Sequence, residues 1–163
     1  MQCYTFAMSQ PDITIRLGVL DDLDILTNFA VAMACEIEKK NVDREQVKEA
    51  TCSALADTAK ALYFVAELGG EVVGSLMVTY EWSDWQNANY WWIQSVYVMP
   101  STRRKGVYRA IYDHVFEEAR RVSGVASVKL YVYEGNEIAQ QTYEALGMSK
   151  TPYYIYESVI PRV

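Results

Sequence analysis

The sequence predicts a mixed α/β fold, and three observations lead to that prediction. Runs rich in β-branched and aromatic residues alternate with runs whose apolar residues recur at helical spacing. A glycine pair at positions 69 and 70 separates two β-type runs, which predicts a hairpin in the middle of the chain. No linker rich in Pro, Gly or Ser interrupts the 163 residues, so we expect one domain over residues 12–163 behind a flexible tail of residues 1–11.

The first part of the chain predicts one strand followed by two helices. The strand is ITIRL at residues 13–17. Asp21 or Asp22 then caps a helix whose apolar residues are Ile25, Leu26, Phe29, Ala30 and Met33. Asp43 followed by Gln46 resembles a capping box, and it opens a second helix that continues to Leu55.

The rest of the chain predicts strands interrupted by two helices. The expected strands are residues 62–68, 71–82, 90–100, 127–134 and 153–160, with Pro100 closing the third of them. A helix over residues 104–121 follows Pro100, with an apolar stripe of Tyr108, Ile111, Tyr112, Val115, Phe116 and Ala119. Asn136 caps the last helix and Gly147 ends it. The predicted order is therefore β-α-α-β-β-β-α-β-α-β.

Composition narrows the class of protein. Hydrophobic residues make up 51% of the chain and charged residues 22%, which is ordinary for a globular protein, and no apolar run reaches the ~20 residues of a membrane span. The net charge of −6 disfavours binding to a nucleic-acid backbone. Cys3, Cys35 and Cys52 show no C-x-x-C spacing, and Cys35 and Cys52 fall on predicted helices, so we expect those two to be buried thiols rather than zinc ligands. Together these features predict a cytoplasmic protein with no membrane or nucleic-acid partner.

The segment RRKGVYRA, residues 103–110, places two arginines, a lysine and a glycine at a predicted helix start. The helix dipole favours acidic side chains at that position, so the local preference is inverted. A solvated basic turn is one interpretation. An anion site is the other, because the unbonded N–H groups of a helix start point toward a ligand placed before them.

Two motifs resemble the GNAT superfamily of N-acetyltransferases. The first is R-x-x-G-x-G/A after a strand that ends near a proline, which stands here as RRKGVY at 103–108, with Tyr108 in the place of the last Gly or Ala. The second is GNEIAQQTYEALGM at 135–148. Their order, with one strand between them, makes the resemblance specific over residues 13–160.

The resemblance implies a mostly antiparallel central sheet that is flanked by helices and splayed between the fourth and fifth strands. It also implies acetyl-CoA as cosubstrate. Backbone groups of Val96, Tyr97 and Val98 would pair with the pantetheine arm, as an added strand does. The expected cofactor site comprises these three residues together with Arg103, Arg104, Lys105, Gly106, Val107, Tyr108, Arg109, Asn136, Ala139 and Tyr143.

The resemblance gives Tyr143 a catalytic role, and position at a strand end suggests a base, for which a solvated acidic loop residue is the alternative. Tyr143 would lie near the sulfur and hydrogen-bond the departing thiolate, although a core tyrosine is the alternative. The amine must attack as a free base, and Glu81, Asp84 and Glu134 lie at predicted strand ends, of which Glu81 is our first choice. His114 fits a packing role better. The aromatic and acidic stretch at residues 80–92 either holds a cationic amine or packs the sheet.

The resulting functional hypothesis is transfer of an acetyl group to a primary amine by direct attack on the thioester, with a small-molecule or peptide amine as substrate. A non-catalytic acyl-CoA-binding or regulatory module is the alternative. The sequence leaves open the identity of the amine and the formation of a homodimer.

Overall fold

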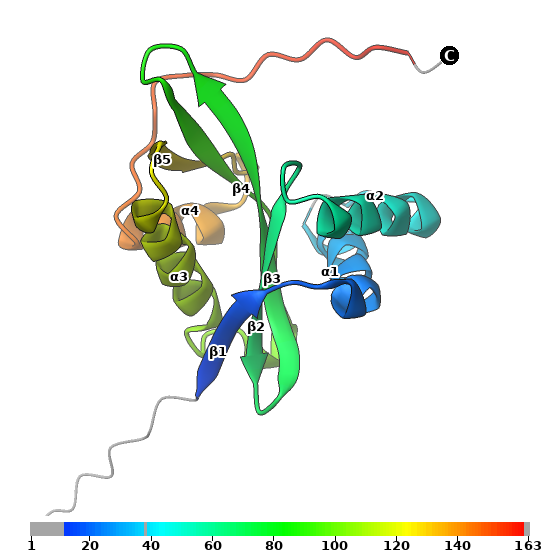
Figure 1. Cartoon of the computed structure of the whole chain (residues 1–163). Helices are drawn as coiled ribbons and strands as arrows, with labels where there is room; N and C mark the ends of the chain where they lie inside the picture. The colour runs from blue at the N-terminus through cyan, green and yellow to red at the C-terminus, as the bar shows by residue number, and fades with distance from the viewer. Residues whose placement is uncertain (1–11, 38, 162–163) are drawn as a thin grey trace, which may run out of the picture. The chain divides into compact units, whose positions relative to one another are not determined.

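A computed structural model describes residues 12–37 and 39–161, and it divides them after Tyr131 into two units. The first unit contains a five-stranded sheet with the strand order β1-β2-β3-β4-β5 (Figure 1). The strands are β1 Ile13–Leu17, β2 Leu62–Leu68, β3 Glu71–Ser83, β4 Ala88–Val98 and β5 Val125–Leu130. The pairings from β1 to β4 are antiparallel, whereas β4 and β5 are parallel. The predicted mixed, mostly antiparallel sheet is confirmed.

Helices cover both faces of this sheet. Figure 1 shows α1 (Leu23–Glu36) and α2 (Arg44–Ala56) on one face and α3 (Val107–Arg121) on the other. On the α1 side, Leu26 packs with the buried residues Tyr63 and Val65 of β2. On the α3 side, Ile111 and Val115 are fully buried. The predicted cap of the second helix is confirmed, because the Asp43 carboxylate accepts the N–H groups at the start of α2.

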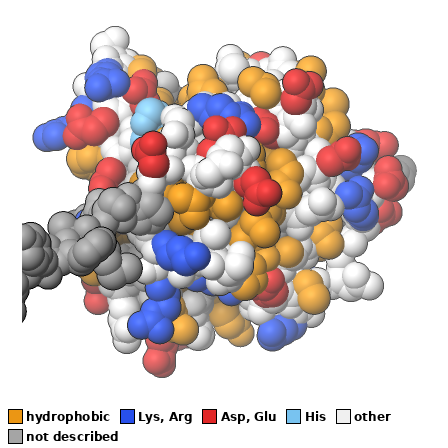
Figure 2. All heavy atoms as spheres, turned by 90° about the horizontal axis from the view of Figure 1, so that it is seen from below, with side chains coloured by type: hydrophobic (Ala, Val, Ile, Leu, Met, Phe, Trp, Pro, Cys, Tyr) orange, Lys and Arg blue, Asp and Glu red, His pale blue; other side chains and the backbone are white. Residues whose placement is uncertain are grey.

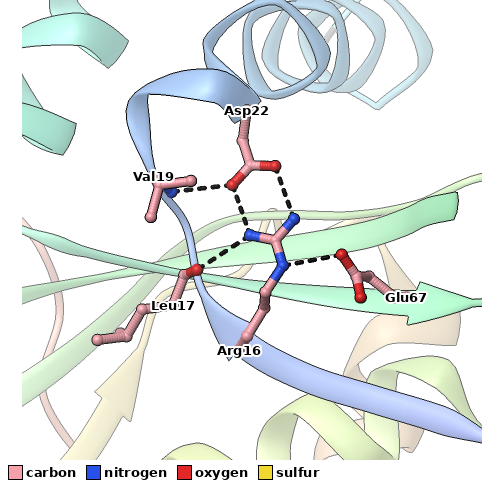
Figure 3. A network of polar contacts seen from close by, with 5 residues as sticks. All are labelled: Arg16, Leu17, Val19, Asp22 and Glu67. Atoms are coloured by element: carbon pink, nitrogen blue, oxygen red, sulfur yellow. Dashed lines mark hydrogen bonds and ion pairs between the residues drawn. The ribbon is translucent and has the colours of Figure 1, made fainter. Parts of the chain in front are cut away.

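A polar network joins β1 to the start of α1 (Figure 3). The Arg16 guanidinium donates to both oxygens of the Asp22 carboxylate, at 2.7 and 2.9 Å, and to Glu67 Oε1 of β2 at 2.8 Å. The backbone N–H of Val19 also donates to Asp22 Oδ2, at 2.8 Å. The sequence had suggested Asp21 or Asp22 as the cap of α1. The Asp22 side chain does not cap this helix, because it is hydrogen-bonded to Arg16 and Val19 instead. These hydrogen bonds, with Arg16 first, hold the pKa of the buried Asp22 carboxyl below its usual value.

The second unit contains α4 (Glu137–Ala145). The Asn136 side chain accepts the N–H of Ala139 at 3.2 Å, which confirms the predicted cap. Gly147 has a φ of +87°, and the N–H of Met148 donates to the carbonyl of Tyr143 at 3.1 Å. These are the features of a glycine-terminated helix, also as predicted.

The predicted strand at residues 153–160 is wrong. These residues form no strand, and Tyr153, Tyr154, Ile155 and Tyr156 are 70 to 93% exposed. A high β-propensity forms a strand only where a neighbouring backbone completes the hydrogen bonds, and the paired strands of the described chain do not include this segment. For the same reason β5 ends at Leu130 and not at residue 134, because its register with β4 stops there.

Three smaller predictions also need correction. The helix expected from residue 104 begins at Val107, because Arg104 and Gly106 have left-handed φ values of +65° and +85° that no α-helix contains. Phe116 was expected in the buried stripe and is 40% exposed. Cys35 is exposed and Cys52 is half-buried, rather than both being buried. Cys3 and the predicted tail of residues 1–11 lie outside the described residues.

Candidate active site

β4 contains a bulge close to the point where it stops pairing with β5. Gln94 pairs with Met77 of β3 and Tyr97 pairs with Ser75, so that two residues of β4 stand opposite one of β3. Ser95, inside the bulge, has a φ of +50°. The parallel register with β5 ends at the pair of Ile93 and Leu130. Within the described chain, residues 94–98 are therefore paired on the β3 side only.

An unpaired strand edge offers alternating N–H and C=O groups that an extended ligand can use. The predicted cofactor residues Val96, Tyr97 and Val98 lie in this segment, and their assignment to pantetheine stays a prediction. The Tyr97 side chain has a separate use. The side chain is buried, and its ring centroid lies 5.0 Å from that of Phe29. Its hydroxyl donates to Glu36 Oε1 at 2.9 Å.

The chain next forms the turn that the sequence predicted as an anion site. A short 3₁₀ turn at Pro100–Thr102 is anchored through Met99, whose N–H donates to the carbonyl of Val73 at 2.9 Å. Gly106 then precedes α3, and no side chain caps the helix start. Arg104, Lys105 and Gly106 are exposed. The first N–H groups of α3 are thus accessible to an anion.

The basic side chains of this turn fall into two groups. Arg104, Lys105 and Arg109 are exposed, and no hydrogen bond or ion pair joins them to another described residue. Arg103 differs: its Nη2 lies 2.6 Å from Glu36 Oε2, and its Nε donates to the carbonyl of Val98 at 2.9 Å. This ion pair is the first cause of the lowered pKa of Glu36. Arg103 therefore links the turn to the end of α1, a role that the motif did not reveal.

Positive charge does not spread over the face of the molecule drawn in Figure 2. There, Lys and Arg side chains stand singly or in small groups between acidic and hydrophobic ones.

Tyr108, which departs from the motif, is half-buried with its ring 6.2 Å from that of Tyr112. Its side chain thus packs along α3, where the neighbouring Val107 is fully buried.

The predicted residues of the second motif lie on α4. Asn136, Ala139 and Tyr143 occur at helical spacing, and the Asn136 side chain is used as the cap described above. Burial raises the pKa of the Tyr143 phenol above its usual value. The phenol therefore keeps its proton at neutral pH. The placement of these residues against the cofactor stays a prediction.

A row of polar and aromatic side chains lies on the sheet face that α1 covers. This face is identified by Met77, which packs against the cluster of Leu26, and alternate residues along β3 share it. Three hydrogen bonds cross the row: Trp92 Nε1 to Glu81 Oε2 at 2.5 Å, Gln94 Nε2 to Thr79 Oγ1 at 2.5 Å, and the Tyr131 hydroxyl to Gln94 Oε1 at 3.2 Å. Glu81 is exposed. Gln94, Thr79 and Tyr131 were not predicted, because their contacts depend on which residues of neighbouring strands lie side by side.

The other candidate bases and the one histidine have different surroundings. Asp84 is exposed in the turn between β3 and β4, and Glu134 is exposed in the second unit. His114 packs edge-on against Phe64 at 5.7 Å, which agrees with its expected packing role. A cavity of about 880 Å³ lies against α3 and is lined by side chains that include His114, Tyr80 and Trp91, none of them from the basic turn.

Comparison with known proteins places this geometry in context. The model of a family described as the acetyltransferase (GNAT) family matches residues 29–148. A crystal structure of a possible acetyltransferase from Clostridium difficile 630 is 36% identical, with a TM-score of 0.87, over 92% of this chain and 99% of that chain. No curated protein matches.

Two more distant structures share the fold. A predicted acetyltransferase from Clostridium acetobutylicum, solved with acetyl-CoA, is 14% identical with a TM-score of 0.75, over 90% of this chain and 96% of that chain. AAC(6')-Iy, in complex with the bisubstrate analogue CoA-S-monomethyl-acetylneamine, is 16% identical with a TM-score of 0.73, over 91% and 99%. None of the described helices is both long and apolar enough to cross a membrane.

Proposed function

This chain belongs to the acetyltransferase (GNAT) family, and from that premise we propose that it transfers an acetyl group from acetyl-CoA to a primary amine. The observation that carries the proposal is the continuity of two features in one unit. The one-sided edge of β4 at residues 94–98 runs directly into a glycine turn at an uncapped helix start. The first suits an extended amide-bearing arm and the second suits a pyrophosphate.

The residues present fit this cosubstrate. The N–H groups of residues 104–109 provide hydrogen-bond donors, and Arg104, Lys105 and Arg109 provide charge that no described acid neutralises. When bound, acetyl-CoA supplies an activated acetyl group and a thiolate that must leave. Arg103 holds the turn in place through Glu36 and Val98. Donors that are fixed before the ligand arrives lose little entropy on binding.

Two side chains would move or hold protons. Tyr143 keeps a proton on its hydroxyl at neutral pH and would donate a hydrogen bond to negative charge as it develops on the sulfur. Glu81 would accept the proton of the amine, directly or through water. Glu81 is exposed, and Trp92 Nε1 donates to its Oε2, so its Oε1 would be the acceptor. The free thiols of Cys35 and Cys52 support a reducing, cytoplasmic location.

The decisive experiment combines binding and turnover. Calorimetry with CoA tests the cofactor site, and thiol release from acetyl-CoA in the presence of a panel of amines tests the reaction. We expect micromolar binding and amine-dependent thiol release. Binding without thiol release on any amine would instead support a non-catalytic acyl-CoA-binding module. Absence of CoA binding would refute the proposal.

A further inference from the structure

The ammonium group of Lys129 lies on two aromatic rings of the neighbouring strand. Its Nζ is 3.2 Å from the ring centroid of Tyr90 and 5.5 Å from that of Trp92. The contact follows from register: Trp92 of β4 pairs with Lys129 of β5, and Tyr90 lies two residues earlier on the same face. No described carboxylate forms an ion pair with Lys129. We call the two rings the Tyr90–Trp92 cradle.

Contacts that do not involve Lys129 hold the Trp92 ring and the backbone of Tyr90. The Trp92 indole N–H donates to Glu81, and the Trp92 ring lies 5.8 Å from that of Tyr131. Tyr90 is fixed in β4 between Glu81 on β3 and Ser127 on β5. Both aromatic side chains are half-buried and therefore remain reachable from solvent. A cation that displaced the flexible lysine side chain would find the Trp92 ring in place and the Tyr90 ring on the same face of β4.

We propose that the Tyr90–Trp92 cradle binds a second, non-reacting cation of the acceptor, and that Lys129 occupies it in the free protein. The proposal rests on the function proposed above and names its substrate class, a linear amine with two or more positive charges. Two arguments favour a second cation over the reacting amine itself.

The first argument is chemical. Aromatic faces stabilise the charged form of an amine, whereas the nucleophile must lose its proton before it attacks. A cradle of this kind would hold the reacting nitrogen in its unreactive state.

The second argument is geometric. Trp92 and Tyr90 precede the bulge residue Ser95 by three and five positions, which corresponds to about 10 and 17 Å along a strand. If the acetyl group lies at the bulge end of the unpaired edge, an amine in the cradle cannot also reach it, and Glu81, which is hydrogen-bonded to Trp92 of the cradle, would receive the proton of the reacting amine through water. An acceptor whose two charges are roughly 10 Å apart can occupy both places.

The first test is a comparison of matched acceptors in the acetyl-transfer assay. The probes are 1,8-diaminooctane, 8-amino-1-octanol, which has the same length and one charge, and 1,2-diaminoethane, whose charges are too close. We expect kcat/KM for 1,8-diaminooctane to exceed that of the amino alcohol by roughly 3- to 30-fold, the range of one cation–π contact. A lysine-containing peptide series forms a second arm and shows whether the dication is a small molecule or a peptide. Equal kcat/KM for the first two probes would overturn the proposal.

Variants assign that preference to the cradle. Tyr90→Leu and Trp92→Leu should abolish the advantage of the diamine, and Tyr90→Leu does so without removing the hydrogen bond between Trp92 and Glu81. Trp85→Leu is the matched control, because Trp85 is 87% exposed in the β3–β4 turn. Lys129→Met removes the occupant and should lower KM for the diamine about 3- to 10-fold. A preference that survives both cradle variants contradicts the proposal.

A binding measurement separates this proposal from the proposed function. The indole ¹⁵N–H resonance of Trp92, assigned by comparison with Trp92→Phe, is titrated with 1,8-diaminooctane and with 1,8-octanediol at constant ionic strength. A shift caused only by the diamine, in a protein that acetylates no amine, would support the cradle and refute the proposed acetyltransferase function. Acetyl transfer without any such shift would support the proposed function and refute the cradle. The absence of both refutes both.

Discussion

Two neighbouring regions of the first unit would recognise ligands in different ways under the proposed function. In the segment of residues 94–109, the groups that would face a ligand are mostly backbone: one edge of β4, a glycine turn and the start of α3. In the row around the Tyr90–Trp92 cradle they are side chains from three strands, namely Glu81, Tyr90, Trp92 and Lys129. The two regions meet at Gln94 and Ser95, where β4 bulges.

This difference explains which part of the proposed function can be predicted from the sequence. Backbone recognition needs a strand, a glycine and a helix in sequence order, and it tolerates many side chains, as Tyr108 in the motif shows. Side-chain recognition depends on which residues of β3, β4 and β5 lie opposite one another, and the register decides that. We therefore expect substitutions in the first region to affect CoA, and those in the second to affect the amine.

The substitution with the largest expected effect is Tyr143→Phe, because the proposed function makes the reaction of acetyl-CoA depend on this one side chain as well as on backbone groups. Loss of the hydroxyl should lower kcat on the order of 10²-fold while the affinity for acetyl-CoA changes little, since the hydrogen bond strengthens as thiolate charge develops. Tyr156→Phe, at a tyrosine that is 93% exposed, is the control. A wild-type kcat in a folded Tyr143→Phe enzyme would contradict the role at the sulfur and support a packing role for Tyr143.

Gly106→Asp tests the backbone region directly. A Cβ at Gly106 meets nothing within 4 Å, so the cost comes from the φ of +85° and from negative charge beside the pyrophosphate. Together these should weaken CoA binding roughly 30-fold, measured by calorimetry. Gly69→Asp is a matched control, since Gly69 also has a positive φ and open space but lies in the hairpin turn. Equal losses in the two variants would mean that strain alone, and not the phosphate site, is responsible.

Glu81→Gln sharpens the comparison on the acceptor side. If Glu81 accepts the proton, kcat/KM should fall about tenfold at neutral pH and recover in part as rising pH deprotonates the amine. CoA affinity should not change. Glu71→Gln, at the other end of β3, is the control. A pH–rate profile identical to that of the wild type would transfer the role to Asp84, Glu134 or solvent.

Arg103 and Glu36 test whether the basic turn is positioned or merely charged. If Arg103 positions the turn, Arg103→Ala and Glu36→Gln should each weaken CoA binding roughly 2- to 5-fold, because either one breaks the same ion pair. If Arg103 contacts phosphate instead, Glu36→Gln should free it and strengthen binding. Glu49→Gln, which removes an exposed carboxylate of α2, controls for net charge.

Asp22→Asn should change the affinity for neither acetyl-CoA nor the amine, so its effect on function is the smallest of the set. Loss of the hydrogen bonds from Arg16 should lower the free energy of unfolding by about 2 kcal/mol at pH 7 in urea titrations. The pKa of Asp22 is lowered in the folded state, so its contribution is present above the usual value of about 3.9 and is lost as pH falls through the folded value. The difference from wild type should therefore shrink as the pH falls below about 3.9. Asp21→Asn, at an exposed neighbour, should show no such difference.

Local signals predicted most elements of the fold correctly. The glycine pair at 69 and 70, the Asp43 and Asn136 caps and the Gly147 terminus each depend on a few adjacent residues, and each stands where it was expected. The strand at 153–160 was wrong because its formation depends on a partner strand and not on its own composition. Asp22 was misread because its partner, Arg16, precedes it on a strand and competes for its carboxylate.

The candidate site divides in the same way. The turn at residues 103–109 was predictable because all its parts are contiguous. Glu36 was not, because it is 67 residues from Arg103 in the chain. The bulge at Ser95 has no signature of its own, since the position of an extra residue is set by the pairing of β3 and β4. The Lys129 contact needed the register of a parallel pair that only the folded sheet defines.

The single parallel pair also has a consequence for the order in which the sheet assembles. β2, β3 and β4 follow one another through short turns and can pair as soon as each is synthesised, whereas β1 must wait for β2 and β5 must wait for the crossover through α3. During synthesis, β4 therefore spends a period as an edge strand along its whole length, Ala88–Val98. Arrival of β5 shields the half up to Ile93 from aggregation and leaves the other half accessible. The proposed cofactor site is the part of this nascent edge that no strand of the described chain covers.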